Sequence, residues 1–136
     1  MRAYTIATVA VTLGVPTKWL DNALSRFTVR GVIQARQGVS RRLGPQAVII
    51  LHIASELNRV LGVSVGDALS LADKLTTMGG IATITLFSTA SITVDVEATE
   101  REVAERLAQA IEMTPVPRRG RPPSGERPSS RRQPPK

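Results

Sequence analysis

Polar and basic side chains near the start of the chain could hydrogen-bond to an extended anion. They alternate with apolar residues at helical spacing over positions 17–26, so they would share one open helix face. Such groups can reach base edges or phosphates of duplex DNA, with Asn22 suited to adenine and Arg26 to guanine or a phosphate. The candidate DNA contacts on this face are Thr17, Lys18, Asn22, Ser25 and Arg26.

A second basic group follows in a segment centred on a glycine. Short β-prone pieces lie on either side of Gly38, which predicts a hairpin over residues 31–43. Its candidate contacts, to the DNA backbone or the minor groove, are Arg36, Gln37, Arg41 and Arg42. The alternative is a small helical protein with an ordinary solvated basic face.

A third basic group occupies the last 22 residues, which hold seven prolines and six arginines. They have too few apolar side chains to offset chain entropy, so residues 115–136 are expected to form a disordered tail. Arg119-Gly120-Arg121-Pro122 resembles the core of an AT-hook, which enters the minor groove. The expected tail contacts are Arg118, Arg119, Gly120, Arg121 and Pro122. The alternatives are generic counterion-release affinity or binding to an acidic protein.

Charge is divided along the chain. Residues 1–60 carry a net charge of +6, residues 61–114 carry −5 and residues 115–136 carry +6, within a total of +7. This division predicts that residues 1–60 (the head) and residues 115–136 (the tail) bind a polyanion, while residues 61–114 (the middle segment) have another function.

Five helices and a second hairpin are expected to position these groups. Gly14 ends the first helix, Pro16 starts the second, and Ser64 caps the fourth. The helices are expected near residues 6–13, 16–27, 45–61, 65–78 and 99–113, with strands at 81–87 and 92–96. Trp19 is expected at the core or its edge rather than on DNA.

The head resembles the winged helix-turn-helix of the MerR family. Tyr4-Thr5-Ile6, Val9-Ala10 and Gly14-Val15 match its opening pattern. After its second helix the family has a glycine-leucine-isoleucine step, which corresponds to Gly31-Val32-Ile33 here. The end of the family's wing is similar to residues 38–43, with Arg41 in the place of the family arginine. The family enters its next helix through a glycine-hydrophobic-serine-leucine step, which corresponds to Gly62-Val63-Ser64-Val65.

The resemblance covers about residues 4–75 and implies binding to double-stranded DNA. In the family's recognition helix, a Thr-Leu-Arg-Tyr-Tyr run occupies the positions that are residues 19–23 here, so Asp21 stands where the family has an arginine. The chain also lacks a long dimerising coiled coil and cysteine effector ligands, so metal or redox sensing is not implied.

The expected fold is mainly α with a small β content (α+β): a winged helix-turn-helix followed by a β-hairpin and a C-terminal helix. The expected units are residues 1–78, which bind DNA, residues 79–114, which dimerise or bind a partner, and the tail 115–136. An isolated two-stranded ribbon is marginal in water. One face of the second hairpin would therefore be buried by a second copy; it carries Ala82, Ile84, Leu86, Ile92, Val94 and Val96.

Several classes of function are not expected. The absence of cysteine excludes disulfides, thiolate metal sites and thiol nucleophiles. His52 is the only histidine, so we expect no metal site and interpret it as a hydrogen-bonded residue at a helix edge. No catalytic set or phosphate-cradling loop occurs, so neither an enzyme nor a cofactor is expected. No apolar run of about 18 residues suggests a membrane span, and the start of the chain is expected to be mature protein rather than a signal sequence.

The leading expectation is a sequence-specific DNA-binding transcriptional regulator that acts as a homodimer, in the cytoplasm on the nucleoid. One alternative is an antitoxin-like subunit that neutralises a protein partner through residues 79–136 and regulates its own expression. Another is an architectural or recombination accessory protein.

Overall fold

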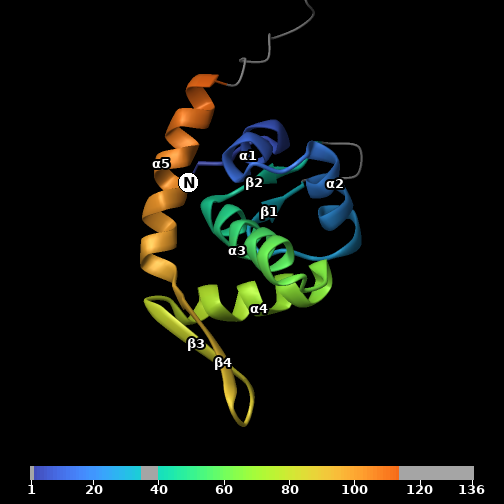
Figure 1. Ribbon diagram of the computed structural model, residues 1–136. Coiled ribbons are helices and arrows are strands. Elements are labelled where there is room, and N and C mark those ends of the chain that lie inside the picture. The colour runs from blue at the N-terminus through green and yellow to red at the C-terminus, as the bar shows by residue number, and fades with distance from the viewer. Residues whose placement is uncertain (1, 35–39, 114–136) are drawn as a thin grey trace, which may run out of the picture.

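A computed structural model describes residues 2–34 and 40–113 of the protein (Figure 1). Helices dominate, and the strands form two separate two-stranded antiparallel sheets, β1–β2 and β3–β4. The expected α+β class is confirmed. In chain order the elements are α1 (Ile6–Leu13), α2 (Thr17–Arg26), β1 (Val32–Ile33), β2 (Arg42–Leu43), α3 (Pro45–Leu61), α4 (Val65–Met78), β3 (Ile81–Phe87), β4 (Ala90–Asp95) and α5 (Val96–Met113).

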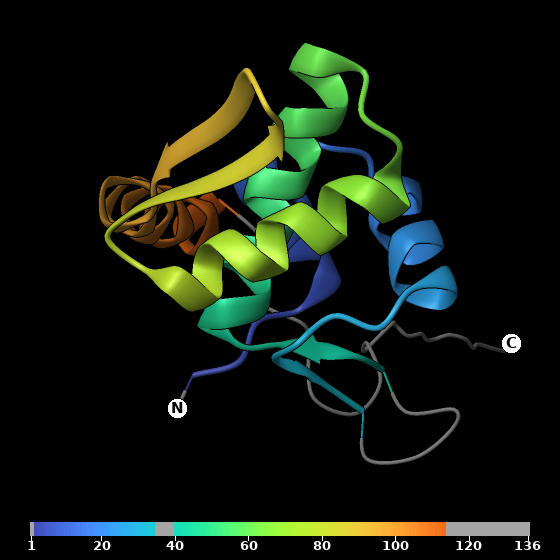
Figure 2. The same cartoon turned by 90° about the horizontal axis from the view of Figure 1, so that it is seen from below.

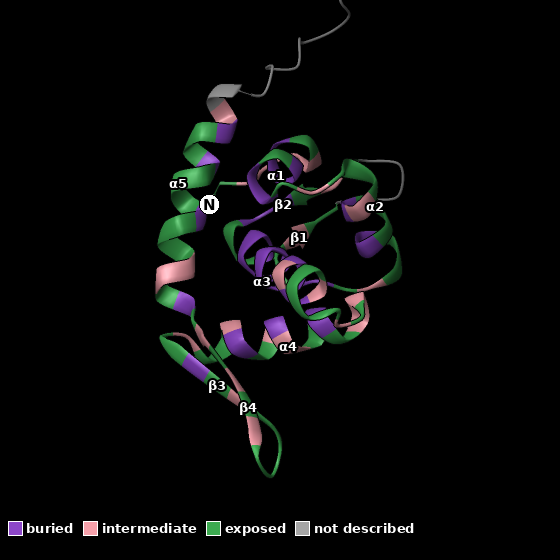
Figure 3. Cartoon of the chain, viewed as in Figure 1, coloured by how far each residue is buried: buried purple, intermediate pink, exposed green. Residues whose placement is uncertain are grey.

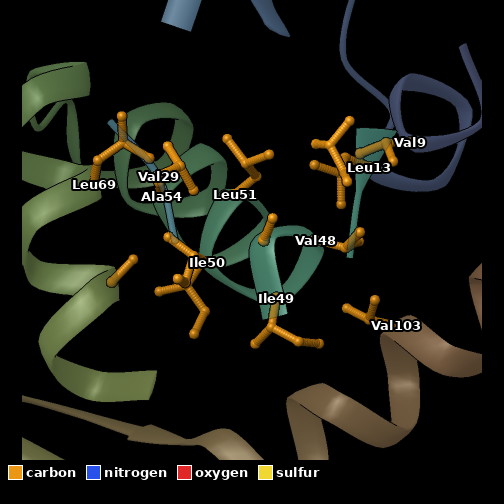
Figure 4. Packing of buried hydrophobic residues seen from close by; sticks show 14 of the residues in the cluster. Val9, Leu13, Val29, Val48, Ile49, Ile50, Leu51, Ala54, Leu69 and Val103 are labelled. Atoms are coloured by element: carbon orange, nitrogen blue, oxygen red, sulfur yellow. The ribbon is translucent and has the colours of Figure 1, made fainter. Parts of the chain in front are cut away.

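Helix α3 lies at the centre of the molecule. Ten of its 17 residues are buried, and they occupy every side of the helix rather than one stripe. Its side chains meet those of α1, α4 and α5 in one hydrophobic cluster (Figure 4). Full burial of a side chain such as Ile50 or Leu51 contributes about 1.5–3 kcal/mol. The other helices are therefore held in place mainly by their contacts with α3.

The helix boundaries in the first half follow from their caps. The Thr5 hydroxyl accepts a hydrogen bond from the Thr8 N–H at 3.2 Å, and the Ser64 hydroxyl accepts one from the Asp67 N–H at 3.3 Å, which confirms the predicted cap. The expected start of the second helix at Pro16 is off by one residue. Pro16 has extended backbone and caps the helix, which begins at Thr17.

The second half differs from the sequence prediction at the entry to the last helix. That helix begins at Val96, directly after β4, and not at Thr99. The Asp95 carboxylate accepts the Ala98 N–H at 2.9 Å, and the Val96 N–H donates to the Gly80 carbonyl at 2.7 Å. These bonds satisfy backbone N–H groups at the start of α5, so the chain passes from the strand into the helix without a connecting loop. β4 also starts earlier than predicted, at Ala90.

The inner face of the β3–β4 hairpin is buried only near its base. Ala82 and Val96 belong to the main hydrophobic cluster, so the expectation that they need a second copy is wrong. Ile84, Ile92 and Val94 are half-buried. Because this cluster includes residues on both sides of residue 78, the core is continuous there. The role of residues 79–114 as a dimerisation or partner-binding unit stays a prediction.

No helix within residues 2–34 and 40–113 is both long and apolar enough to cross a bilayer.

His52 lies inside the core rather than at a helix edge, contrary to the sequence interpretation. Its side chain is buried, and its Nδ1 atom has no hydrogen-bond partner among the described residues. Burial disfavours the charged imidazole and lowers the pKa of His52 below 6.5; the nearby Glu56 and Glu102 oppose this shift, and Arg106 and Arg59 add to it. His52 is therefore neutral in the folded protein near pH 7.

We expect His52 to make stability fall with acidification. The unfolded chain takes up a proton near pH 6.5, whereas the folded chain does so only at a lower pH. The free energy of unfolding should therefore be constant well above pH 6.5 and decrease as the pH falls through 6.5 toward the lower folded value. Thermal unfolding of wild type and His52→Leu between pH 8 and pH 5 tests this, because the variant should lose this part of the decrease. Parallel curves for the two proteins would contradict it.

Candidate nucleic-acid interface

Helix α2 presents the polar face that its spacing predicted. Leu20, Ala23 and Leu24 are buried. The five candidate contacts are all exposed; they are Thr17, Lys18, Asn22, Ser25 and Arg26. Trp19 is only partly exposed and packs against the hydrophobic cluster, as expected of a residue at the core edge. The burial pattern thus leaves one side of α2 open to a partner (Figure 3).

The predicted hairpin over residues 31–43 is present as the β1–β2 pair, with Val32 opposite Leu43 and Ile33 opposite Arg42. Tyr4 adds a third extended piece, because its N–H and C=O each bond to Leu43 at 2.8 Å. Of the predicted contacts here, Arg42 is exposed and Arg41 is partly exposed. Arg36 and Gln37 lie outside the described residues, as do the tail contacts Arg118, Arg119, Gly120, Arg121 and Pro122.

The structure brings α2 and this hairpin together around one depression, which we call the interface hollow. It has a volume of about 470 Å³ and is lined by Thr5, Ile6, Asp21, Gln34, Ser40, Arg41 and Arg42. Asp21 therefore shares a surface with both arginines, and Thr17, Lys18 and Ser25 lie three or four residues from it on the same helix face. Figure 2 shows the segment that leads from α2 into the β1–β2 pair.

Cations around the hollow are not neutralised within the described part of the chain. The four ion pairs there use Arg30, Arg59, Arg101 and Arg106. Lys18 and Arg26 on α2, and Arg41 and Arg42 at the hairpin, take no part in them, although the Arg26 guanidinium lies 5.5 Å from the centre of the Phe27 ring. Unneutralised cations on one surface can replace counterions on a polyanion.

Arg30 contributes to the positive charge of residues 1–60, but it is paired with an acid within the protein. Its Nε atom lies 2.5 Å from the Asp73 carboxylate, and its Nη2 atom donates to the Asp73 carbonyl at 3.2 Å and to the Thr77 hydroxyl at 2.8 Å. These bonds fasten the loop between α2 and β1 to α4. Sequence reasoning missed the role because the partners are 43 and 47 residues away.

Gly31 holds the base of the β1–β2 hairpin against the start of α3. Its φ is +92°, and its carbonyl accepts the Gly44 N–H at 2.8 Å. A Cβ atom at this position would lie 2.8 Å from the Ala47 nitrogen and 3.2 Å from the Ala47 Cβ. Glycine is therefore needed here for both its backbone angle and the close approach.

No three histidine, aspartate or glutamate side chains within the described ranges gather closely enough to hold a metal ion. A larger hollow lies elsewhere, between α5 and the first half of the chain. It has a volume of about 690 Å³, and its lining includes Tyr4, Pro45, Ile49, Val103 and Leu107. Its mainly apolar walls suit an apolar surface rather than a phosphate.

No protein-family model, curated protein or solved structure matches this chain.

We expect Gly31→Ala to destabilise the fold far more than Gly14→Ala. Both glycines have positive φ, which costs a residue with a side chain about 1–2 kcal/mol. A Cβ at Gly14 would meet nothing within 4 Å, whereas one at Gly31 would overlap the backbone of Ala47. Urea unfolding should therefore show a loss of about 1 kcal/mol for Gly14→Ala and more than about 2 kcal/mol for Gly31→Ala. Equal losses would contradict the close approach.

Replacing Arg30 by Met should lower the free energy of unfolding by about 1 kcal/mol, because three hydrogen bonds to α4 are lost from a partly exposed site. The matched control is Arg59→Met, which removes one exposed pair with Glu56 within α3 and should cost about 0.3 kcal/mol. Chemical denaturation of both variants measures the difference. A loss for Arg30→Met no larger than the control's would argue against its role as a tether.

Proposed function

We propose that the protein is a DNA-binding transcriptional regulator in which α2 and the β1–β2 hairpin form a winged helix-turn-helix. The observation that carries the proposal is the interface hollow, where Arg41 and Arg42 lie beside the open face of α2. Neither arginine is paired with an acid in the described residues. The same arrangement of a polar helix face and a basic hairpin suits a duplex better than a small anion, since its cations are spread along a surface.

In this proposal α2 enters the major groove and the β1–β2 hairpin follows the phosphate backbone. Asn22 would read adenine, Arg26 would bind guanine or a phosphate, and Lys18 would bind a phosphate. Thr17 and Ser25 can donate to phosphate oxygens. A bidentate base contact supplies about 1–3 kcal/mol of discrimination, whereas phosphate contacts supply affinity without sequence preference.

Asp21 determines how α2 can approach the duplex. A carboxylate in the interface hollow repels phosphates, so this part of α2 is disfavoured against the backbone. A carboxylate can instead accept a hydrogen bond from the amino group of cytosine in the major groove. We therefore propose that Asp21 faces base edges while Arg41 and Arg42 take the phosphates. On this proposal the protein is located with the DNA of the cell.

The alternative function is an antitoxin-like subunit. The apolar hollow of about 690 Å³ between α5 and the head favours it, because a segment of a partner protein could bury apolar side chains there. The position of this hollow beside α5, away from α2, leaves both activities compatible (Figure 1). Absence of DNA binding by every protein in the following experiment would make this alternative the leading proposal.

The test is fluorescence anisotropy of the full chain with random-sequence and selected duplexes at about 50–200 mM KCl. We expect Arg41→Ala/Arg42→Ala to weaken binding at least about tenfold and to reduce the salt slope by about 2, one for each lost phosphate contact. The matched control is Arg101→Ala/Arg106→Ala, which removes the same charge from α5, where both arginines pair with glutamates. It should bind within about twofold of wild type.

Equal losses in the two double variants would show that only net charge matters and would overturn the assignment of the interface. A truncation to residues 1–114 then measures the share of affinity that the tail contributes.

A further inference from the structure

Before Asp95, the β3–β4 hairpin lacks the charges, proline and glycine that would protect its strand edges from pairing, although its register is irregular between Thr85 and Phe87. No charged residue occurs between Lys74 and Asp95, and residues 81–95 contain neither proline nor glycine. The sheet consists of these two strands within the described chain, so each strand has one edge without a strand partner. Proteins commonly protect such edges with charges, proline or a covering element. Here the hairpin extends beyond α4, on the far side of the molecule from α1 (Figure 1).

Exposed apolar side chains occur at both ends of the hairpin. At its tip, Leu86 is 46% exposed and Phe87 is 62% exposed. Near its base, Val60 and Leu61 at the end of α3 are each 62% exposed. Between the base of β4 and the end of α3 lies a mostly apolar hollow of about 290 Å³, which we call the base hollow; its lining includes Leu57, Val60, Leu61 and Val94.

We propose that this hairpin is the dimerisation element and that its occupant is a second copy of the chain. The longer strand, β3, would pair antiparallel with β3 of the second copy about a two-fold axis and make a four-stranded sheet.

The two-fold arrangement explains why apolar groups lie at both ends. When two identical hairpins pair antiparallel, the tip of each lies beside the base of the other. Phe87 at the tip of one copy then lies beside the base of β3 in the second copy, where Ile81 is 73% exposed, and the reverse contact forms at the same time. The paired surface is thus complementary to itself, and β3 carries no charged side chain, so its pairing buries no unpaired ion.

The dimer does not depend on DNA, so it is tested on the protein alone. Light scattering after gel filtration should give a dimer for wild type at micromolar concentration. Leu86→Lys should raise the dimer dissociation constant at least about thirtyfold, since it places a charge in the apolar contact. The matched control is Val11→Lys on α1, where the native side chain is similarly exposed at 49%; it should remain dimeric.

The absence of cysteine allows a second, independent measurement. In Thr85→Cys the only thiol lies on β3, so a short bismaleimide can join it only to the same residue of another molecule, and we expect a covalent dimer in high yield. Ser70→Cys, exposed on α4, is the control and should stay monomeric under denaturing conditions. A monomeric wild type, a dimer unaffected by Leu86→Lys, or equal cross-linking at both positions would overturn the proposal. Loss of DNA binding alone would leave it intact.

Discussion

The structure depends on the burial of α3 from all sides. A helix with one apolar stripe needs a single neighbour, but α3 has buried residues around its circumference and must be enclosed. Helices α1, α4 and α5 enclose it, and their positions fix everything attached to them. The start of α3 supports the β1–β2 hairpin through Ala47 and Gly31, while its end supplies Val60 and Leu61 to the base hollow.

The division of charge in the sequence has a physical counterpart in the fold. The ion pairs in the described residues lie within α3 and α5 or join the loop before β1 to α4, so three acids of the middle segment pair with arginines close to them in space. The cations of α2 and the β1–β2 hairpin are left to solvent. The ion pairs themselves are exposed and add little stability. Their larger effect is to leave one surface of the molecule basic, which is the surface that the proposed function uses.

Local patterns in the sequence located the elements, although not all of their starting residues, and they did not predict the contacts between elements. Helical periodicity, Gly14 and Ser64 located the helices, and the polar face of α2 followed from the same spacing. The early start of α5 was missed because Asp95 looked like the end of a strand, although it also caps a helix. The contacts of Arg30 were missed because its partners, Asp73 and Thr77, are distant in the sequence. His52 was misread because its burial depends on the packing of several helices.

The direct passage from β4 into α5 has a mechanical consequence. With no loop between Asp95 and Val96, and with the junction tied to Gly80, the hairpin and the 18-residue helix share a stiff joint instead of a hinge. A torque applied at the hairpin tip would therefore turn α5 as a lever. Since α5 packs through Val103 and Leu107 into the cluster that also contains Val9 of α1, that rotation would displace α1. α5 would thus couple strain in the β3–β4 hairpin to the position of α1.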